Sequence, residues 1–267
     1  MRKYAVGITI AVALVVFACS TVPITGRKQL SLIPASEMLS MSYTEYDSVL
    51  KTSKLSTNQQ QTQLVKRVGG RIQKAVETYF AEKNLADQLK DYKWEFNLVE
   101  SNEVNAWCMP GGKVVVYTGI LPVTQNEVGL AVVLGHEISH AVAQHGSERM
   151  SQGLLAQLGG QALSVALQNK PEQTKQLWMS VYGVGAQVGV LLPYSRTHES
   201  EADHLGLIFM SMGGYDPNEA VTFWQRMAAS GGQKPPEFLS THPADETRIA
   251  DIKKEVPEAM QYYRKQQ

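Results

Sequence analysis

The sequence predicts an α+β fold that is mainly helical, with a small antiparallel sheet directly before its central helix. Apolar residues recur at intervals of four through 64–80, which is typical of an amphipathic helix. Apolar and polar residues alternate over 94–98, and the runs 104–108 and 113–117 flank a Pro-Gly-Gly turn, as in paired strands. The stretch from 124 onwards begins with a capping-box pattern and continues with an apolar face, which predicts the central helix.

The composition is that of a globular protein and excludes some partners. Hydrophobic residues make up 43% and charged residues 19% of the 267 residues, a length that fits one large domain or two small ones. The 25 basic residues balance the 25 acidic ones without a basic block, so we expect no nucleic acid partner. The two cysteines, Cys19 and Cys108, are too few for a disulfide framework or a cysteine-based zinc site.

The N-terminus has the pattern of an export signal. Two basic residues precede an apolar run over 4–18, which is shorter than the roughly 20 residues that a spanning helix needs. We therefore expect residues 1–18 to form a signal peptide. The end of this run, Val16–Cys19, resembles a bacterial lipobox and predicts that Cys19 is lipidated; an ordinary signal peptide with a buried cysteine nearby is the alternative.

This interpretation sets the expected domain organisation and localisation. Residues 19–55 would form the lipidated N-terminus, a polar tether and a short helix near 36–49, and residues 56–267 the main domain. By resemblance to bacterial lipoproteins, Ser20 after the cysteine implies sorting to the outer membrane. We therefore expect a lipid-anchored protein on the periplasmic face of the cell envelope.

The central helix contains the pattern H-E-x-x-H, formed by His136, Glu137 and His140. Residues four apart on a helix lie about 40° apart and about 6 Å along the axis, so two imidazoles can hold one metal ion from one face. Glu137 lies beside that face, where it can reach a metal-bound water as general base. A lone helical histidine is more often a surface or core residue, but two with the intervening glutamate favour the metal site, with a zincin-like arrangement.

A catalytic zinc needs a third protein ligand and one open position. The extended H-E-x-x-H-x-x-G-x-x-H form is excluded, because Ala143 and Gly146 occupy the positions of its glycine and last histidine. Glu199 and Glu201 remain as candidates. Glu199 shares a helix face with Asp203, four residues later, whereas Glu201 points about 200° away from Glu199.

This spacing favours Glu199 as the ligand. Asp203 would then accept a hydrogen bond from the outer nitrogen of a zinc-bound histidine, which fixes the tautomer and orientation of the ring. We expect the neighbouring His198 and His204 to be surface residues.

The segment 151–193 between the two ligand helices is rich in Gly, Ala and Gln. Its apolar part, 177–192, has only 16 residues and contains Gln187, so we expect a buried or cleft-covering helix rather than a membrane span; contact with a membrane surface is the alternative.

Two residues near the C-terminus are further site candidates. His242 follows a Gly/Pro-rich loop at 231–236, from which it could approach the metal as an additional ligand or stabilise an oxyanion; a capping or packing role is the alternative. Arg248 is a candidate for stabilising transition-state charge, and an ordinary salt bridge is its alternative.

Four separated motifs resemble one zinc metallopeptidase family. They are His136–His140, Tyr194–Arg196, Glu199–Asp203 and Ser240–Pro243 with the following Arg248. The family includes the CaaX prenyl endopeptidases and HtpX, and the chain looks most like its bacterial periplasmic and lipoprotein members such as BepA and LoiP. The resemblance covers roughly residues 36–255 and implies a zincin-like domain with one Zn²⁺ per chain, held by His136, His140 and Glu199. The Trp107-Cys108 pair departs from the family's hairpin.

We therefore expect a zinc-dependent metalloendopeptidase that hydrolyses peptide bonds of unfolded or extended polypeptides. The free edge of the small sheet could hold an extended peptide through main-chain hydrogen bonds, or be merely structural. The resemblance implies misfolded or stalled envelope proteins as substrates, with envelope proteins as further partners. The alternative is a chaperone-like or assembly-factor lipoprotein with latent protease activity.

Overall fold

A computed structural model describes residues 19–22, 24–187, 192–229 and 237–263. The chain divides into two units, which we call the smaller unit (1–38 and 144–198) and the larger unit (39–143 and 199–267). The predicted signal peptide at 1–18 lies outside the described residues. Cys19 begins strand β1, and its lipidation stays a prediction.

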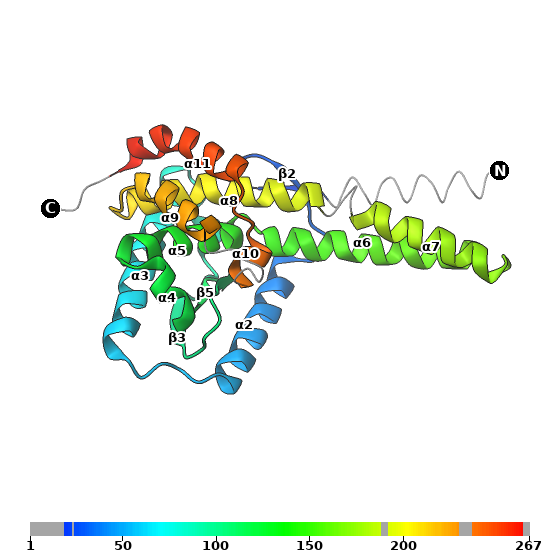
Figure 1. Cartoon of the computed structure of the whole chain (residues 1–267), viewed down its shortest axis with the longest axis horizontal. Helices are drawn as coiled ribbons and strands as arrows, with labels where there is room; N and C mark the ends of the chain where they lie inside the picture. The colour runs from blue at the N-terminus through cyan, green and yellow to red at the C-terminus, as the bar shows by residue number, and fades with distance from the viewer. Residues whose placement is uncertain (1–18, 23, 188–191, 230–236, 264–267) are drawn as a thin grey trace. The chain divides into compact units, whose positions relative to one another are not determined.

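The larger unit holds most of the helices and the sheet that position the site (Figure 1). Along the whole chain, the elements of three or more residues are β1 (Cys19–Thr21), β2 (Lys28–Leu30), α2 (Ala35–Thr52), α3 (Gln59–Glu82), η1 (Ala86–Leu89), β3 (Glu95–Val99), β4 (Ala106–Met109), β5 (Lys113–Tyr117), η2 (Thr118–Ile120), α4 (Leu121–Thr124), α5 (Glu127–Val142), α6 (His145–Ala166), α7 (Glu172–Ala186), α8 (Leu192–Met212), α9 (Asn218–Ala229), α10 (Glu237–Thr241), α11 (Glu246–Ala259) and η4 (Met260–Tyr262).

Helix α3 forms where the four-residue spacing predicts it. Its N-terminus is capped by the Asn58 side chain, which accepts from the Gln61 amide, and its buried face includes Val68, Ile72 and Val76. Gly69 lies on this face against the ring of Phe96 in β3, and an added Cβ would come within 2.2 Å of that ring. The glycine therefore lets α3 pack closely on the sheet.

The sheet has the order β3–β5–β4, so β4 is an edge strand. Strands β4 and β5 form the predicted antiparallel hairpin, whose turn needs glycines because Gly111 and Gly112 have φ values of 86° and 80°. Strand β3 pairs with β5 in parallel, which makes the sheet mixed. Alternation of apolar and polar residues does not distinguish the two directions, because the side-chain period is two in both.

Helix α5 is buried from Gly129 to Val142. Its N-cap is Asn126, which accepts from the Gly129 amide at 2.9 Å, rather than the predicted Thr124, which ends the short helix α4. The helix ends at Val142, and Gln144, with a φ of 62°, starts a new helix, α6. Helices α3 and α9 and strand β4 all contact α5, so it is the core helix of the larger unit.

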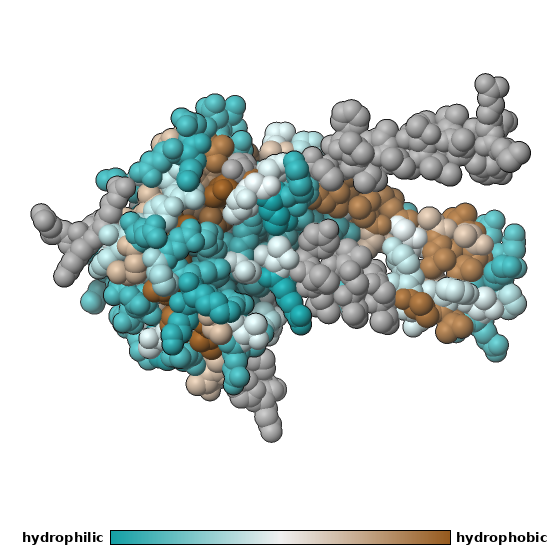
Figure 2. Space-filling model, turned by 90° about the horizontal axis from the view of Figure 1, so that it is seen from above, coloured by the Kyte–Doolittle hydropathy of each residue, from teal (hydrophilic) through white to brown (hydrophobic). Residues whose placement is uncertain are grey.

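In the smaller unit, α6 and α7 pack together, and the Tyr182 hydroxyl donates to the Ala156 carbonyl at 2.8 Å. Within 177–187 the prediction of a buried helix is wrong, because Leu177 and Trp178 are 63% and 52% exposed, and residues 188–191 lie outside the described residues. Figure 2 shows apolar side chains over the surface of these two helices. Of the helices that are described, none has both the length and the apolar character to cross a membrane.

The prediction that His198 is a surface residue is also wrong. It is buried in the smaller unit, where its Nε2 lies 2.9 Å from Glu148 Oε2 and its ring stacks on that of His145 at 4.3 Å. Arg27 donates to the same Glu148 oxygen at 2.8 Å. Burial alone would raise the pKa of Glu148, but His198 and Arg27 outweigh it and lower this pKa to about 2.

Candidate metal centre

Four side chains of the larger unit converge on one buried point. His136 and His140 come from α5, Glu199 from α8, and His242 from the residue after α10. All four are buried, and the ligand atoms that they offer lie within 4.8 Å of one another.

The distances between these atoms match a tetrahedral metal site. His136 Nε2 lies 3.0 Å from His140 Nε2 and 3.0 Å from His242 Nδ1. Glu199 places one oxygen 3.3 Å from His136 Nε2 and the other 3.3 Å from His140 Nε2. Zinc bonds of about 2.0–2.1 Å in a tetrahedron set the ligand atoms about 3.3 Å apart. The four side chains therefore surround a position where one zinc ion fits.

The chemistry of the donors fits a cation at that point. His136 Nδ1 donates to Asp203 Oδ1 at 2.9 Å, so its Nε2 carries a lone pair when the ring is neutral. This lone pair faces two other imidazole nitrogens and a carboxylate. Burial raises the pKa of Glu199, but hydrogen bonds from His136, His140 and His242 in their protonated forms outweigh it and hold this pKa far below its usual range.

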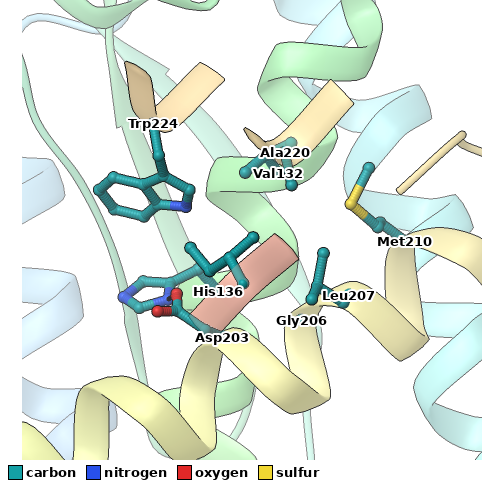
Figure 3. A pocket seen from close by; sticks show the side chains of 9 residues that line it. Val132, His136, Asp203, Gly206, Leu207, Met210, Ala220 and Trp224 are labelled. Atoms are coloured by element: carbon teal, nitrogen blue, oxygen red, sulfur yellow. Dashed lines mark ion pairs between the residues drawn. The ribbon is translucent and has the colours of Figure 1, made fainter. Parts of the chain in front are cut away.

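Asp203 and Arg248 hold the metal-site side chains in position through hydrogen bonds and ion pairs. Arg248 binds Asp203 with two bonds, Nε to Oδ2 at 2.7 Å and Nη2 to Oδ1 at 2.8 Å, and its Nη1 lies 3.2 Å from Glu199 Oε2. Its guanidinium also stacks on Trp224, 3.6 Å from the ring centroid. Burial raises the pKa of Asp203, but the charge of Arg248 and the bond from His136 keep it lowered. Figure 3 shows Trp224, His136 and Asp203 around one small cavity.

Glu137 lies next to the convergence point without belonging to it. Its side chain is buried, and its Oε1 lies 3.4 Å from His242 Nε2. This is the position of a base that faces a metal-bound water. Burial, and then the charge of Glu137, raise the pKa of the Cys108 thiol well above its usual value. A thiol of this kind is a poor metal ligand at neutral pH, and Cys108 is not in the converging set.

The structure brings together nearly all the residues that the sequence singled out: Glu137, His136, His140, Glu199, Asp203, His242 and Arg248. Glu201 lies outside the converging set of the described residues. The contact between Trp224 and Arg248 was not predicted, because no sequence spacing relates α9 to α11.

The comparisons with known proteins agree with this geometry. Residues 67–256 match the family model described as Peptidase family M48. The mitochondrial metalloendopeptidase OMA1 of Schizosaccharomyces pombe is 39% identical over 177 residues, 64% of this chain and 49% of the relative. The OMA1 protein of Saccharomyces cerevisiae is 31% identical over 90% of this chain and 70% of its own length. The beta-barrel assembly-enhancing protease of Escherichia coli is 32% identical over 60% of this chain and 34% of its own length.

These relatives correct the predicted localisation. The expectation of a localisation on the periplasmic face of the outer membrane is contradicted, because several of the relatives, including one at 39% identity, are mitochondrial proteins. The narrower resemblance to BepA and LoiP is not confirmed either, since the beta-barrel assembly-enhancing proteases reach 34% identity against 39% for a mitochondrial relative.

The predicted enzyme class and cofactor are confirmed at the level of the family. The match covers well over half of the chain, the relatives are named as metalloendopeptidases, and the buried donor set fits zinc. The chain spans only about half of the S. pombe relative and about a third of the E. coli one. On its sequence and on the geometry of its site, this chain belongs to peptidase family M48.

Proposed function

We propose that this protein is a zinc-dependent endopeptidase that cleaves unfolded or extended polypeptides. The observation that supports this most directly is the convergence of His136, His140 and Glu199 beside the buried carboxylate of Glu137. A structural zinc site would not need a carboxylate placed next to the ligands without joining them.

Each residue has a defined task in this proposal. Bound zinc would supply Lewis-acid activation of a water and of the substrate carbonyl. His136, His140 and Glu199 hold the ion, and Asp203 keeps the His136 ring in the tautomer that directs Nε2 towards it. Glu137 takes the proton from the attacking water and passes it to the leaving amine.

The position of strand β4 at the edge of the sheet favours an extended substrate. Among the described residues no further strand pairs with the outer side of β4. The strand also contacts α5, the helix that carries Glu137. An extended peptide that adds to this edge would bind through main-chain hydrogen bonds with little sequence preference, as a protease for misfolded or stalled proteins requires.

One observation favours a second candidate, a chaperone-like or assembly factor with latent protease activity. His242 takes the fourth position around the metal point, which a catalytic zinc keeps open for water. The arrangement described here is therefore closed, and a resting protein of this kind would bind polypeptides without cleaving them.

The deciding experiment is cleavage of unfolded casein by the purified, zinc-loaded protein. We expect wild type to cleave internal bonds, an excess of chelator to abolish cleavage, and Glu137→Gln to lower the rate by a factor of about 10² or more while still binding one zinc ion. Glu45→Gln, a change at an exposed glutamate of α2, is the matched control and should be as active as wild type. If zinc-loaded wild type cleaved casein no faster than Glu137→Gln, the latent alternative would replace the proposed enzyme.

The role of the β4 edge is tested with the substrate rather than the enzyme. Methylating alternate backbone amides of a cleavable peptide removes donors that strand pairing needs, so we expect KM to rise several-fold with a smaller change in kcat. The peptide methylated at the other alternate set, whose amides point away from β4, is the control. Equal effects of the two sets would contradict binding by strand addition.

A further inference from the structure

Helices α5 and α8, which carry His136, His140 and Glu199, contact each other at a pair of glycines, one on each helix. A Cβ atom added to Gly206 of α8 would lie 3.0 Å from the backbone nitrogen of His136 and 3.1 Å from the carbonyl carbon of Gly135. A Cβ added to Gly135 would lie 2.9 Å from the carbonyl oxygen of Gly206. Because the atoms on both sides belong to the backbone, no side chain can move aside to make room.

Gly206 lies on the same face of α8 as the carboxylates of the site. Glu199, Asp203 and Gly206 follow one another at spacings of four and three, which is one stripe of a helix. Glu199 is seven residues before Gly206, about 10 Å along the helix axis. A small change in the angle between the helices at Gly206 would therefore shift the position of Glu199. Figure 3 shows Gly206 beside Asp203 and His136, around the same small cavity.

A metal site tolerates less movement than one methyl group here would cause. A contact of 3.0 Å is tighter than ordinary van der Waals contact, so a methyl group on Gly206 would displace the α5 backbone at His136 by a few tenths of an ångström. Zinc–ligand distances hold within about 0.2 Å. The displacement acts directly on the helix that supplies His136 and His140.

We propose that Gly135 and Gly206 are positioning residues, which set the separation of α5 and α8 at which His136, His140 and Glu199 reach one zinc ion. This inference rests on the zinc site of the proposed function but not on the substrate or on cleavage. The two glycines touch neither the ion nor the reacting atoms; they act through the helices that carry the ligands.

The test compares two alanine variants that both crowd α5. In Gly206→Ala we expect zinc affinity, measured on the full chain by competition with a chromogenic chelator, to fall by about 10- to 100-fold, with a changed visible spectrum of the Co²⁺-loaded protein. The matched control is Gly129→Ala, where the added Cβ would meet the Thr124 carbonyl oxygen at 2.1 Å, but away from α8. It should melt at a lower temperature and keep the wild-type zinc affinity. Gly70→Ala, where a Cβ meets nothing within 4 Å, should change neither.

The outcomes separate this inference from the proposed function. Unchanged zinc affinity and Co²⁺ spectrum in Gly206→Ala would overturn the inference, as would an equal loss in Gly129→Ala. If Gly206→Ala does not fold, Gly135→Ala is measured in the same way. If neither variant folds while Gly129→Ala does, the contact between the two glycines is needed for folding, and its role in positioning the zinc ligands is refuted. A wild type that binds zinc without cleaving casein would refute the proposed enzyme and leave the positioning role standing, whereas a wild type that binds no zinc would refute both.

Discussion

His242 is the residue whose position most affects what the site can do. Its Nδ1 lies 2.9 Å and 3.1 Å from the two oxygens of Glu199, and its Nε2 faces Glu137. The two carboxylates that it contacts surround the point that a substrate carbonyl and its attacking water must approach. In the proposed zinc enzyme, His242 would have to leave the fourth position around the metal before cleavage.

Replacing His242 by alanine should raise activity. We expect His242→Ala, fully loaded with zinc, to cleave casein several-fold faster than wild type, because the fourth position is open to water from the start. Initial rates at saturating zinc measure this, and His204→Ala, at a half-exposed histidine of α8, is the control. A rate below that of wild type would instead assign His242 a part in transition-state stabilisation.

At the scale of elements, α11 holds α8 in place partly through charged groups. Arg248 of α11 binds Asp203 of α8, and two turns further the carboxyl of Glu255 faces Asp203, Asp251 and Glu258. The Nδ1 atom of His204 in α8 lies 3.7 Å from Oε2 of Glu255. Burial and these three carboxylates raise the pKa of Glu255 to about 7.

This raised pKa predicts how stability depends on pH. The folded state binds the Glu255 proton more tightly than the unfolded state, so the group stabilises the fold below about pH 4.5, and this contribution is lost as pH rises towards 7. We expect Glu255→Gln to exceed wild type by about 1 kcal/mol in free energy of unfolding at pH 8, with solvent screening included, and to match it near pH 4. Urea titrations at the two pH values measure this, with Glu45→Gln as control. A difference that is the same at both pH values would contradict the titration of Glu255.

Sequence reasoning succeeded for elements whose pattern is local. The four-residue spacing in α3, the glycine turn between β4 and β5, and the stripe of Glu199 and Asp203 all depend on residues close in the chain. It failed where the partner is distant. His198 is buried and pairs with Glu148, which is fifty residues away in the sequence. Leu177 is exposed, because exposure depends on which side of a helix packs against other elements, and this cannot be seen from the helix's own residues. The break at Gln144 was missed because glutamine rarely adopts the left-handed conformation that starts α6.

At the scale of the whole molecule, the metal centre joins segments that are far apart in sequence. His136 and Glu199 are 63 residues apart, and His242 follows 43 residues after Glu199. An ion that binds only the assembled site stabilises the folded chain against the unfolded one. The site therefore contributes to stability as well as to catalysis.

Metal removal should lower the melting temperature. Free zinc at a thousand times its Kd stabilises the folded state by about 4 kcal/mol, which corresponds to a shift on the order of 10 °C for a domain of this size. Thermal melts with zinc and with excess chelator measure this. The His136→Ala variant should melt at the same temperature under both conditions, and a chelator-dependent shift in that variant would place the stabilising ion elsewhere.

The buried charges around the metal point also have a consequence for electroneutrality. Glu137, Glu199 and Asp203 contribute three negative charges and Arg248 one positive charge, so with neutral imidazoles the group carries a net charge of −2. A divalent cation balances this sum, and a monovalent one leaves a buried charge uncompensated. Without the ion, a proton takes up part of the deficit: burial lowers the pKa of His136, but its bonds to Asp203 and Glu199 raise it to about 9. Zinc uptake near neutral pH should therefore release a proton, and its heat of binding should vary with the ionisation enthalpy of the buffer.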